Sequence, residues 1–587
     1  MMRTSNCGEL NLRSVDREVT LAGWVDTRRD HGNLIFIDLR DRWGVTQIVF
    51  NKDRDPEIHR EAEKLRPEFV IQIRGKVAKR PEGAVNKKIP TGEIEITTNA
   101  LKILNASPTP PFEIGDHFVG EELRLKYRFL DLRRKEMVEA LTFRYKVTKA
   151  VRDYLDHQGF LEVETPYLTR STPEGARDFL VPSRLTPATF YALPQSPQLF
   201  KQLLMVSGYD RYYQLARCFR DEDLRSDRQP EHTQIDLEMS FVDEKDVMKV
   251  VEGMVADVLE KMRQVKLDRP FRCLSYDEAM SRFGTDKPDL RFALELKDVS
   301  AVFEASGFKI FDEALAQKGK IRALCFTPPR SAVFSRKDFD DLTLWIKDFG
   351  AKGLAWFKVT GENKVESPIE KFFDAPRIAK LVKTVEAKPG DIIFMVASDP
   401  RTSAVALGAL RCRLAEDFQL IPQDRLEILW VVDFPMFEWN EEEKRFQALH
   451  HPFTAPRPED ITLLESDPAR VRARAYDLVL NGTEIGGGSI RIHEREIQEK
   501  VFQALQIGAE EAQDKFGFLL SALSYGAPPH GGLAIGLDRF VTLLLGRESI
   551  REVIAFPKTQ KGTCLMTEAP SHVSAKQLKE LGLSIKG

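Results

Sequence analysis

The sequence contains few cysteines, and their positions exclude two common kinds of structural cross-link. Six cysteines are spread through 587 residues, and no two of them form a Cys-x-x-Cys pair. Structural zinc sites and disulfide frameworks need cysteines at close or regular spacing, so we expect neither. Scattered thiols are typical of a protein of the reducing cytoplasm.

The sequence also lacks long apolar stretches and an overall excess of positive charge. No segment approaches the length of a membrane span, and the N-terminal MMRTSNCGELNLRS has no apolar run that would indicate a signal peptide. Because the formal net charge is −3, any contact with nucleic acid must come from local basic patches. No Walker A sequence occurs, and the glycine-rich segments are not dinucleotide-binding fingerprints, since no βαβ unit surrounds them.

At 42% hydrophobic and 30% charged residues, the composition is that of a soluble globular protein with several domains. Residues 1–105 predict the first of them, a small β domain with one helix near residues 56–65. Its five expected strands are residues 19–25, 34–39, 46–50, 69–77 and 94–103. Five strands and one helix indicate an OB-fold, a barrel that binds single-stranded nucleic acid by base stacking and basic side chains.

Candidate nucleic-acid contacts lie on these strands. Arg28 and Arg29 supply positive charge, while Phe36 and Gln47 have the chemistry to stack on a base and to read its edge. The alternative is a plain β-barrel with Phe36 in its core, and composition does not decide between the two.

A linker and a helical region follow. Residues 105–116 contain three prolines and no periodicity, which indicates a linker. Residues 121–135 are dense in arginine and lysine, either as a solvated helix face or as a contact to an RNA backbone. The apolar period predicts a helix over 141–157, ended by Gly159, and then a strand over 160–165.

Residues 212–243 predict two strands joined by a charged loop. They read YYQLARCFRDEDLRSDRQPEHTQIDLEMSFVD. The second strand alternates between an apolar face with Ile235, Leu237, Met239 and Phe241 and a polar face with Gln234, Asp236, Glu238 and Ser240. Charged hairpin loops are usually solvated, but arginine binds phosphate bidentately and carboxylates hold hard cations.

Two further segments place candidate binding groups. QSPQLFK, residues 195–201, predicts a helix start with Ser196 as the N-cap, which brings Gln198 and Lys201 to a helix N-terminus. ALHHPFTAP, residues 448–456, contains two adjacent histidines. Adjacent positions on a strand point to opposite faces and no third ligand lies nearby, so a metal is disfavoured there.

Two glycine-rich segments in the last part of the chain carry further candidate binding groups. YDLVLNGTEIGGGSIRIH, residues 476–493, predicts two strands around a turn, with Asp477 and Glu484 as suitable oxygen ligands for Mg²⁺. PPHGGLAIGLDRFVTLLLG, residues 528–546, predicts a strand that runs into a helix. Arg539 lies at the start of that helix, where it and the helix N-terminus can both meet phosphate.

Together these segments resemble a known family. FRDEDLR followed by RQPEHTQIDLE resembles motif 2 of the class II aminoacyl-tRNA synthetases, while residues 141–165 and 528–546 resemble motifs 1 and 3. The motifs stand in class II order, the resemblance covers essentially the whole chain, and QSPQLFK narrows it to the bacterial aspartyl-tRNA synthetases. It implies an α+β fold, in which an OB-fold barrel precedes an antiparallel sheet flanked by helices, with an inserted α+β domain.

The resemblance implies six regions. They are an OB-fold anticodon-binding domain (1–105), a hinge (106–138), a first catalytic part (139–287), the inserted α+β domain (288–419), a second catalytic part (420–560) and a C-terminal extension (561–587). We see no catalytic constellation in the inserted domain.

The implied reaction is ATP-dependent ligation of L-aspartate to tRNA through an aspartyl-adenylate, by a cytoplasmic homodimer that uses Mg²⁺. The implied catalytic residues are Arg220, Glu222 and Arg539. The implied aspartate-binding residues are Glu174, Gln198, Lys201, Arg220, Asp236, His450 and Arg491. The implied ATP-binding residues are Arg220, Asp221, Glu222, Gln229, His232, Glu484, Gly536, Leu537, Asp538 and Arg539, with Asp477 and Glu484 as ligands of Mg²⁺.

Two of these roles carry physical expectations. His232 would stack on adenine where the family more often has phenylalanine, so we expect weaker or pH-sensitive stacking. Arg491 and Lys201 would clamp the side-chain carboxylate of aspartate. A neutral asparagine would leave both cations without an anionic partner, which favours aspartate.

The barrel bears on the choice of tRNA. The expected anticodon contacts are Arg29, His31, Phe36, Gln47 and Gly83. Bacterial aspartyl enzymes charge tRNA(Asp) alone or tRNA(Asn) as well, and His31 and Gly83 resemble the relaxed kind, although turn chemistry alone would allow both residues. The alternatives are a strict tRNA(Asp) enzyme, an asparagine-specific enzyme and a non-catalytic RNA-binding relative. The last is disfavoured because the expected phosphate and metal groups are all present.

Overall fold

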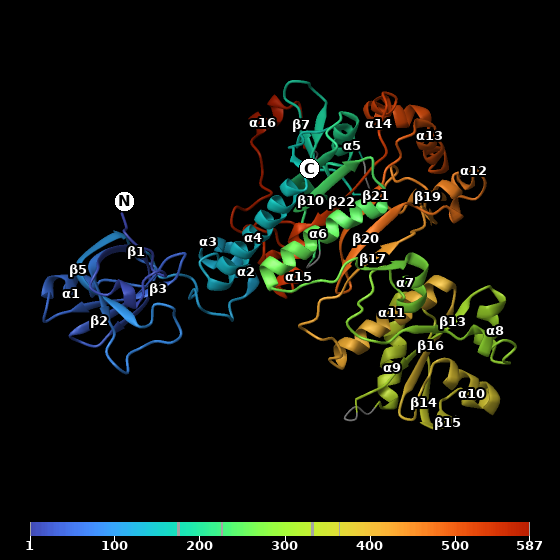
Figure 1. Cartoon of the computed structure of the whole chain (residues 1–587), viewed down its shortest axis with the longest axis horizontal. Helices are drawn as coiled ribbons and strands as arrows, with labels where there is room; N and C mark the ends of the chain where they lie inside the picture. Colours follow the sequence, from blue (N-terminus) through green and yellow to red (C-terminus); the bar gives the residue numbers. More distant parts are fainter. Residues whose placement is uncertain (1, 173–175, 225–226, 330–333, 363, 586–587) are drawn as a thin grey trace. The chain divides into compact units, whose positions relative to one another are not determined.

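The computed structural model describes residues 2–172, 176–224, 227–329, 334–362 and 364–585 (Figure 1). The chain divides into two compact units, one of residues 1–142, 555–559 and 563–570, the other of residues 143–554, 560–562 and 571–587. The boundary falls within helix α4 (Lys135–His157). No helix of the described residues is long and apolar enough to cross a membrane.

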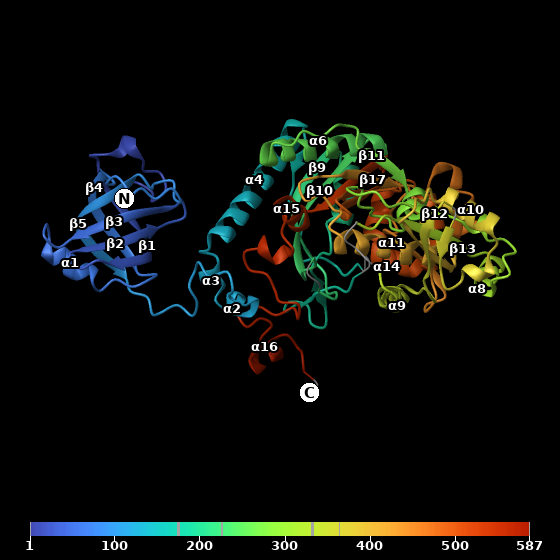
Figure 2. The ribbon, with the colours of Figure 1, turned by 90° about the horizontal axis from the view of Figure 1, so that it is seen from below.

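The first unit contains a closed five-stranded barrel in the order β1-β2-β3-β5-β4 (Figure 2). Its elements are β1 (Glu18–Asp30), β2 (Leu34–Arg40), β3 (Val45–Asn51), α1 (Pro56–Ala62), β4 (Val70–Lys79) and β5 (Ile94–Asn105). The five strands and the single helix confirm the predicted OB-fold.

Strand β2 shows how the sequence builds the barrel. Ile35, Ile37 and Leu39 are fully buried in its core, while the residues between them are partly exposed. Phe36 therefore lies on the outer face, because side chains alternate across a strand. The alternative that placed Phe36 in the barrel core is wrong, and its ring is available on the outer face.

Two arginines of the basic region after the linker, Arg128 and Arg134, are buried. The region forms α2 (Glu121–Lys126), α3 (Arg128–Asp131) and the start of α4, which begins before the predicted residue 141. Arg128 donates to Asp131 at 2.5 Å and to the carbonyl of Ala555 at 2.8 Å, and Arg134 donates to the carbonyl of Asp116 at 3.0 Å. Both arginines therefore hold parts of the fold together. The prediction that this region contacts an RNA backbone is wrong for these two residues.

The second unit is built on an eight-stranded sheet in the order β11-β17-β20-β21-β22-β10-β9-β6. Its strands are β6 (Leu161–Glu162), β9 (Arg211–Phe219), β10 (Glu231–Ser240), β11 (Arg272–Ser275), β17 (Ile428–Val432), β20 (Ala475–Leu480), β21 (Thr483–Ile490) and β22 (His530–Gly536). The inner pairings are antiparallel, and only the edge strands β11 and β6 pair in parallel. The sheet is thus mixed at its edges and antiparallel at its centre, where the candidate site lies.

Helices cover this sheet. Helix α5 (Gln198–Val206) contacts β9 and β10, α15 (Leu537–Leu545) contacts β10, and α6 (Glu244–Arg263) contacts β22. The remaining helices around it are α7 (Tyr276–Phe283), α12 (Leu463–Ser466), α13 (Arg495–Ala504) and α14 (Ala509–Leu523).

Two local predictions in this unit need correction. Strand β10 ends at Ser240, so Phe241 does not join the apolar face; it has a φ of +57° and is 73% exposed. Helix α5 begins one residue later than predicted, with Pro197 at the N-cap position. Ser196 still caps it, because its hydroxyl accepts from the backbone N–H of Gln198 at 3.3 Å.

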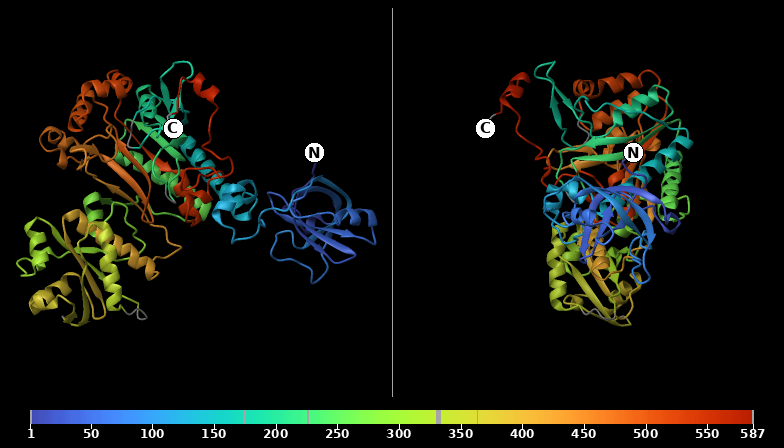
Figure 3. Two further views of the ribbon diagram at one scale, coloured as in Figure 1. Left: turned by 180° about the vertical axis from the view of Figure 1, so that it is seen from behind. Right: turned by 90° about the vertical axis from the view of Figure 1, so that its left-hand side faces the viewer.

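A second sheet, in the order β12-β13-β16-β14-β15, lies within residues 288–419. Its elements are β12 (Leu296–Asp298), α8 (Lys309–Ala316), β13 (Lys320–Phe326), α9 (Arg336–Trp345), β14 (Ala355–Gly361), β15 (Lys364–Glu366), α10 (Ala375–Thr384), β16 (Ile392–Ser398) and α11 (Pro400–Asp417). Helices α9 and α11 pack on one face and α8 and α10 on the other (Figure 3, yellow-green). The structure thus has the mixed α+β character that the sequence predicts here.

Candidate active site

The polar face of β10 is buried, not solvated. Asp236 and Glu238 are both 0% exposed, and each faces a buried cation. The ammonium of Lys201, from the first turn of α5, lies 3.0 Å from Asp236 Oδ2 and 3.3 Å from Glu238 Oε2. Two carboxylates therefore share one lysine in the interior of the sheet.

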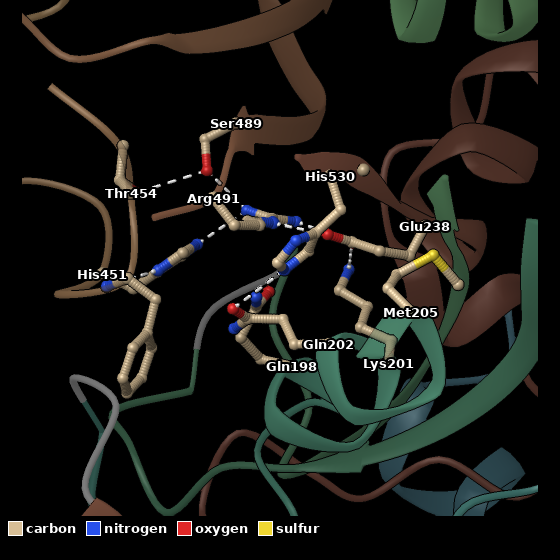
Figure 4. A network of polar contacts seen from close by, with 12 residues as sticks. Gln198, Lys201, Gln202, Met205, Glu238, His451, Thr454, Ser489, Arg491 and His530 are labelled. Atoms are coloured by element: carbon tan, nitrogen blue, oxygen red, sulfur yellow. Dashed lines mark hydrogen bonds and ion pairs between the residues drawn. The ribbon is translucent and has the colours of Figure 1, made fainter. Parts of the chain in front are cut away.

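Arg491, which follows β21, completes this cluster from the other side (Figure 4). Its Nε and Nη2 donate to the two oxygens of Glu238 at 2.9 and 3.1 Å. Its Nη1 donates to Ser489 Oγ at 2.5 Å and to His451 Nε2 at 2.8 Å. The cluster of Lys201, Asp236, Glu238 and Arg491 has two charges of each sign, so it is electrically balanced.

Burial and charge set the proton affinities of the cluster. Burial raises the pKa of Asp236 to about 6, although Lys201 opposes the rise. Burial also acts to raise the pKa of Glu238, but Arg491 and Lys201 outweigh it and hold that pKa below its usual value. Burial and the charge of Arg491 lower the pKa of His451 well below its ordinary value, so this imidazole is neutral and accepts from Arg491.

Unpartnered polar atoms mark where this cluster can meet a ligand. Asp236 Oδ1, Gln198 Nε2 and Gln202 Nε2 are buried and have no hydrogen-bond partner among the described residues. Gln202 Oε1 is held by buried His530, at 3.3 Å. Buried polar groups are normally paired, so an acceptor beside donor amides indicates a site for a molecule with both kinds of group.

Glycine is required beside this cluster on β22. A Cβ at Gly532 would lie 2.1 Å from Glu238 Oε2 and 2.1 Å from the carbonyl oxygen of Leu237. The second of these contacts is with backbone, which cannot move aside. Gly532 therefore lets β22 approach β10 closely enough to enclose Glu238.

A carboxylate pair lies on the neighbouring strands β20 and β21. Asp477 raises the pKa of Glu484, burial raises it further, and Arg539 opposes both. A Cβ at Gly487 would lie 2.6 Å from Asp477 Oδ1, so a larger residue there would displace this carboxylate, while its distance of 3.9 Å from Glu484 Oε1 is an ordinary contact. His450 Nε2 lies 3.6 Å from Asp477 Oδ1, and this carboxylate raises the pKa of His450 despite the opposing effect of burial.

The hairpin between β9 and β10 presents further charged groups. Arg220, at the end of β9, donates from Nε to the carbonyl of Gln195 at 3.5 Å. Glu222 pairs with Arg228 at 2.9 Å, and Asp221 lies 3.9 Å from Arg177 in an exposed pair. Gln229 is buried. Glu174, a predicted aspartate ligand, lies outside the described residues.

His232 has an environment that the sequence did not indicate. Burial, with the charges of Arg220, Arg217 and Arg539, lowers its pKa to about 3. The ring is therefore neutral at any pH near 7. The expectation of pH-sensitive stacking is wrong for this reason.

The N-terminus of α15 combines structural and exposed groups. Gly536 is the N-cap residue and Leu537 is buried. Asp538 is 3% exposed and accepts from the backbone N–H of Thr233 at 2.8 Å and from Arg144 at 2.5 Å. Arg539 donates to the carbonyl of Glu484 at 2.8 Å and lies 3.2 Å from Asp227, so it stands beside the carboxylate pair.

The barrel carries a second polar network on its outer face. Arg29 donates to Gln47 Oε1 at 3.2 Å, and its Nη1 lies 3.0 Å from Asp38. Gln47 Nε2 donates to Glu95 at 2.9 Å, a carboxylate that the sequence did not single out. These groups form a chain of hydrogen-bonding side chains across the four strands β1, β2, β3 and β5.

Of the other predicted barrel contacts, His31 and Gly83 are exposed and Phe36 is partly exposed. His31 and Phe36 meet edge to face, with ring centroids 5.7 Å apart. Gly83 lies in an exposed turn with a φ of +88°. Glycine tolerates that conformation, which turn chemistry alone would also explain.

The structure corrects the predicted basis for amino-acid choice. Lys201 and Arg491 already have anionic partners in Asp236 and Glu238, so asparagine would not leave them uncompensated. Sequence reasoning missed Glu238, although it shares the polar face of β10 with Asp236. It also missed His451, because the histidines were treated as strand residues. They follow β19 (Arg445–Ala448) in a loop, and both are partly buried, His451 beside Arg491 and His450 beside Asp477.

Comparison with known proteins supplies the wider context. Residues 120–560 match the family described as "tRNA synthetases class II (D, K and N)", and residues 19–104 match the OB-fold nucleic acid binding domain. The chain is 56% identical over 587 residues to an aspartate–tRNA(Asp/Asn) ligase of Desulfatibacillum aliphaticivorans, covering all of this chain and 98% of that protein. It is 55% identical over 586 residues to an enzyme of the same name from Caldanaerobacter subterraneus, with the same coverage.

Solved structures show the same fold at low sequence identity. Asparaginyl-tRNA synthetase from Pyrococcus horikoshii, complexed with asparaginyl-adenylate, superposes with a TM-score of 0.60 at 20% identity, over 95% of this chain and 99% of that one. The asparaginyl-tRNA synthetase of Entamoeba histolytica gives a TM-score of 0.57 at 17% identity, over 92% and 95%. At such identities the likeness concerns the fold alone.

Proposed function

The chain belongs to the class II tRNA synthetases of the aspartate, lysine and asparagine group, and we propose that it ligates L-aspartate to both tRNA(Asp) and tRNA(Asn) through an aspartyl-adenylate. The observation that carries the proposal is the buried cluster of Lys201, Arg491, Asp236 and Glu238. A buried cluster with two fixed cations, an unpartnered carboxylate oxygen and donor amides is suited to a small zwitterion that carries an extra carboxylate.

Aspartate fits these groups one by one. Its side-chain carboxylate would meet Lys201 and Arg491, and its ammonium would meet the unpartnered Oδ1 of Asp236. Arg220 would bind the α-carboxylate, with Gln198 donating from its free amide. Lysine is disfavoured because its side-chain ammonium would face the hydrogen-bond donors of Lys201 and Arg491, which offer it no acceptor. Asparagine is disfavoured because an amide nitrogen would face donors only, which leaves polar groups unpaired.

The adenylation step requires positioning and charge stabilisation more than covalent chemistry by the protein. The carboxylate would attack the α-phosphate of ATP, which Arg220 grips, while Arg539 would bind the γ-phosphate. Neutral His232 would stack on adenine at every physiological pH. Glu222, Gln229 and the start of α15 at Gly536 would line the nucleotide.

Asp477 and Glu484 fit a divalent cation. Asp477 raises the electrostatic cost of ionising Glu484, as the raised pKa of Glu484 indicates, and hard carboxylate oxygens suit Mg²⁺. Bound Mg²⁺ would neutralise charge on the phosphates of ATP. The two side chains would hold the ion, and Gly487 leaves Asp477 the space to do so.

We assign anticodon reading to the outer face of the barrel, with Phe36 as a stacking surface and Arg29 and Gln47 as polar contacts. His31 and Gly83, which flank that face, would admit the anticodons of both tRNAs. The relatives from Desulfatibacillum and Caldanaerobacter are named aspartate–tRNA(Asp/Asn) ligases, which supports this wider range.

A homodimer in the cytoplasm completes the proposal. Strand β6 is an edge strand of the main sheet and carries Leu161, which is 51% exposed, with Leu168 exposed nearby. An exposed apolar edge of a sheet suits association with a second copy.

The test is aminoacylation with labelled aspartate on purified tRNA(Asp) and tRNA(Asn), run beside aspartate-dependent ATP–pyrophosphate exchange. Charging of both tRNAs is the expected result. Charging of tRNA(Asp) alone would restrict the enzyme to one tRNA and refute the role of His31 and Gly83. Exchange with asparagine instead of aspartate, or tRNA binding without any exchange, would replace the proposal by an asparagine enzyme or a non-catalytic relative.

A further inference from the structure

The loop between β2 and β3, residues 41–44, presents a tryptophan at the surface of the barrel. Trp43 is 52% exposed. The guanidinium carbon of Arg3 lies 4.9 Å from the centroid of its ring, and that of Arg42 lies 5.4 Å from it. Single exposed apolar side chains are common on proteins, but an exposed indole that two arginines contact is a defined chemical surface.

The backbone of this loop is fixed by the N-terminal segment. The buried carboxylate of Asp41 accepts from the backbone N–H of Trp43 at 2.8 Å and from that of Cys7 at 2.9 Å. It also accepts from the guanidinium of Arg3 at 3.4 Å. A Cβ at Gly8 would lie 2.1 Å from the carbonyl oxygen of Trp43, so the two backbones are in close contact there. The indole is therefore attached to a well-held backbone, which lowers the entropy cost of binding a partner.

The two arginines differ in how their charge is compensated. Arg3 forms an ion pair with Asp41. Arg42 is exposed and, in the parts of the chain that the structure describes, its side chain makes no ion pair and contacts the ring of Trp43. The acidic Glu9 of the N-terminal segment forms its hydrogen bonds within that segment. The loop thus offers an indole and one uncompensated guanidinium, which are groups that stack on a nucleobase and bind phosphate.

The place of the loop in the barrel favours single-stranded RNA as the partner. It joins the two strands that carry Phe36 and Gln47, to which we assign anticodon reading. Trp43 precedes Gln47 by four residues, so their Cα atoms are at most about 14 Å apart. An OB-fold tracks about 4–16 nucleotides of a single strand, which is more than an anticodon triplet. A strand bound at Gln47 therefore has the length to reach this loop, which the matched nucleic acid binding region of residues 19–104 includes.

We propose that Trp43 and Arg42 form a further tRNA contact, in which an unpaired nucleotide of the anticodon loop, next to the triplet, stacks on the indole while Arg42 binds its phosphate. The inference rests on the proposed function, which it extends by one nucleotide-binding site. Stacking tolerates every base, and a phosphate carries no sequence information. The contact therefore adds affinity for tRNA(Asp) and tRNA(Asn) equally and leaves the choice between them to the residues that read the anticodon.

The experiment uses the full chain with purified tRNA(Asp) and tRNA(Asn). We expect Trp43→Ala to raise the KM for both tRNAs about tenfold, because the stacking of one base is lost, and to leave aspartate-dependent ATP–pyrophosphate exchange without tRNA unchanged. Trp43→Phe keeps an aromatic face and should stay within about threefold of the unaltered chain. The matched control is Trp439→Ala, which removes a tryptophan of the second unit that is 44% exposed.

Two further measurements test the stacking and the phosphate contact separately. Binding of tRNA should quench the tryptophan fluorescence of the unaltered chain, and this quenching should be smaller in Trp43→Phe and fully retained in Trp439→Phe. Arg42→Ala should weaken the binding of both tRNAs and lower the slope of log Kd against log salt concentration by about 0.7, because one phosphate contact is lost. If the unaltered chain charges tRNA(Asp) alone, the same variants are measured with that tRNA.

Three results would overturn the inference. An unchanged KM for tRNA in Trp43→Ala, with undiminished quenching in Trp43→Phe, would show that no nucleotide stacks on Trp43; altered sedimentation of Trp43→Ala without tRNA would then assign the loop to a protein contact. A rise in KM for only one of two charged tRNAs would contradict a contact that does not read the base. A lower melting temperature of Trp43→Ala with reduced exchange would show a structural role. Failure of the unaltered chain to charge either tRNA would instead refute the proposed function.

Discussion

The barrel and the main sheet both use arginine, glutamine and carboxylate side chains, but they differ in how much water reaches them. In the barrel, Arg29 pairs with Asp38 at 3.0 Å and its side chain is 43% exposed. In the sheet, Arg491 pairs with Glu238 at 2.9 Å and its side chain is 2% exposed. Nearly identical distances therefore belong to interactions of very different energy.

The difference separates two ways of recognising a ligand. An exposed ion pair contributes about 0–1 kcal/mol, so the barrel can exchange its internal partners for those of a base. Removing one partner of a buried ion pair lowers the free energy of unfolding by about 3–5 kcal/mol. The sheet therefore keeps its charged groups in place before the ligand binds. Charged groups that are fixed before binding favour catalysis, as in the sheet. Groups that can exchange their partners favour recognition of a flexible RNA loop, as in the barrel.

The largest effect is expected from Arg491→Met in the sheet. We expect aspartate-dependent exchange to fall by about 1,000-fold or more and the free energy of unfolding to fall by about 3–5 kcal/mol, because Glu238 loses its bidentate partner and two buried carboxylates are left with Lys201 alone. Denaturant unfolding and exchange assays measure the two effects. Adding Glu238→Gln should recover stability without activity; recovery of both would contradict the assignment of Arg491 to substrate binding.

A smaller effect is expected from Gly487→Ala beside the carboxylate pair. The new Cβ would lie 2.6 Å from Asp477 Oδ1 and displace it, so kcat/KM for ATP should fall by about 100-fold. The matched control is Gly508→Ala, where a Cβ meets nothing within 4 Å. Equal activity of the two variants would exclude Asp477 from the ATP site.

A still smaller effect is expected from Gln47→Ala in the barrel. The KM for tRNA should rise about tenfold, while exchange without tRNA stays unchanged and stability falls by about 1 kcal/mol, since Glu95 loses its partner. Asn99→Ala, which removes an exposed amide from the same strand as Glu95, is the control. A change in exchange activity would show that the two regions are less separate than their networks indicate.

The smallest effect concerns pH. Because its pKa is about 3, His232 is neutral throughout the range from pH 5.5 to 8.5, so no proton is gained there as the pH falls. We expect His232→Phe to leave the shape of the pH profile of kcat/KM for ATP unchanged to within about twofold. Loss of an acidic limb in the variant would show that the histidine titrates in that range.

Local patterns in the sequence predicted the strands well but not their surroundings. Alternation in β10 correctly placed Asp236 and Glu238 on one face and Ile235 and Leu237 on the other. It could not show that the polar face is buried, because Lys201 and Arg491 lie 35 and 253 residues away from their partners. A charged side chain is buried only where such distant partners compensate it, and a local alternation pattern does not predict these partners.

The errors have the same physical origin. Arg128 and Arg134 appeared as an exposed basic face because their buried contacts come from Asp131, the linker and residue 555. His450 and His451 appeared to point apart because a strand was assumed where the chain forms a loop. Family resemblance supplied most roles in the site, while the pairing of Glu238 with Arg491 emerged only from the three-dimensional contacts.

The close approach at Gly532 limits how this pocket can diversify. Any larger residue there meets the backbone of Leu237 as well as Glu238, so no compensating change of Glu238 alone would rescue it. Position 532 on β22 consequently tolerates no residue other than glycine. New amino-acid specificities, whether reached by natural descent or by directed selection, are therefore expected to begin elsewhere in the site, as at His451, which lies in a loop and contacts Arg491.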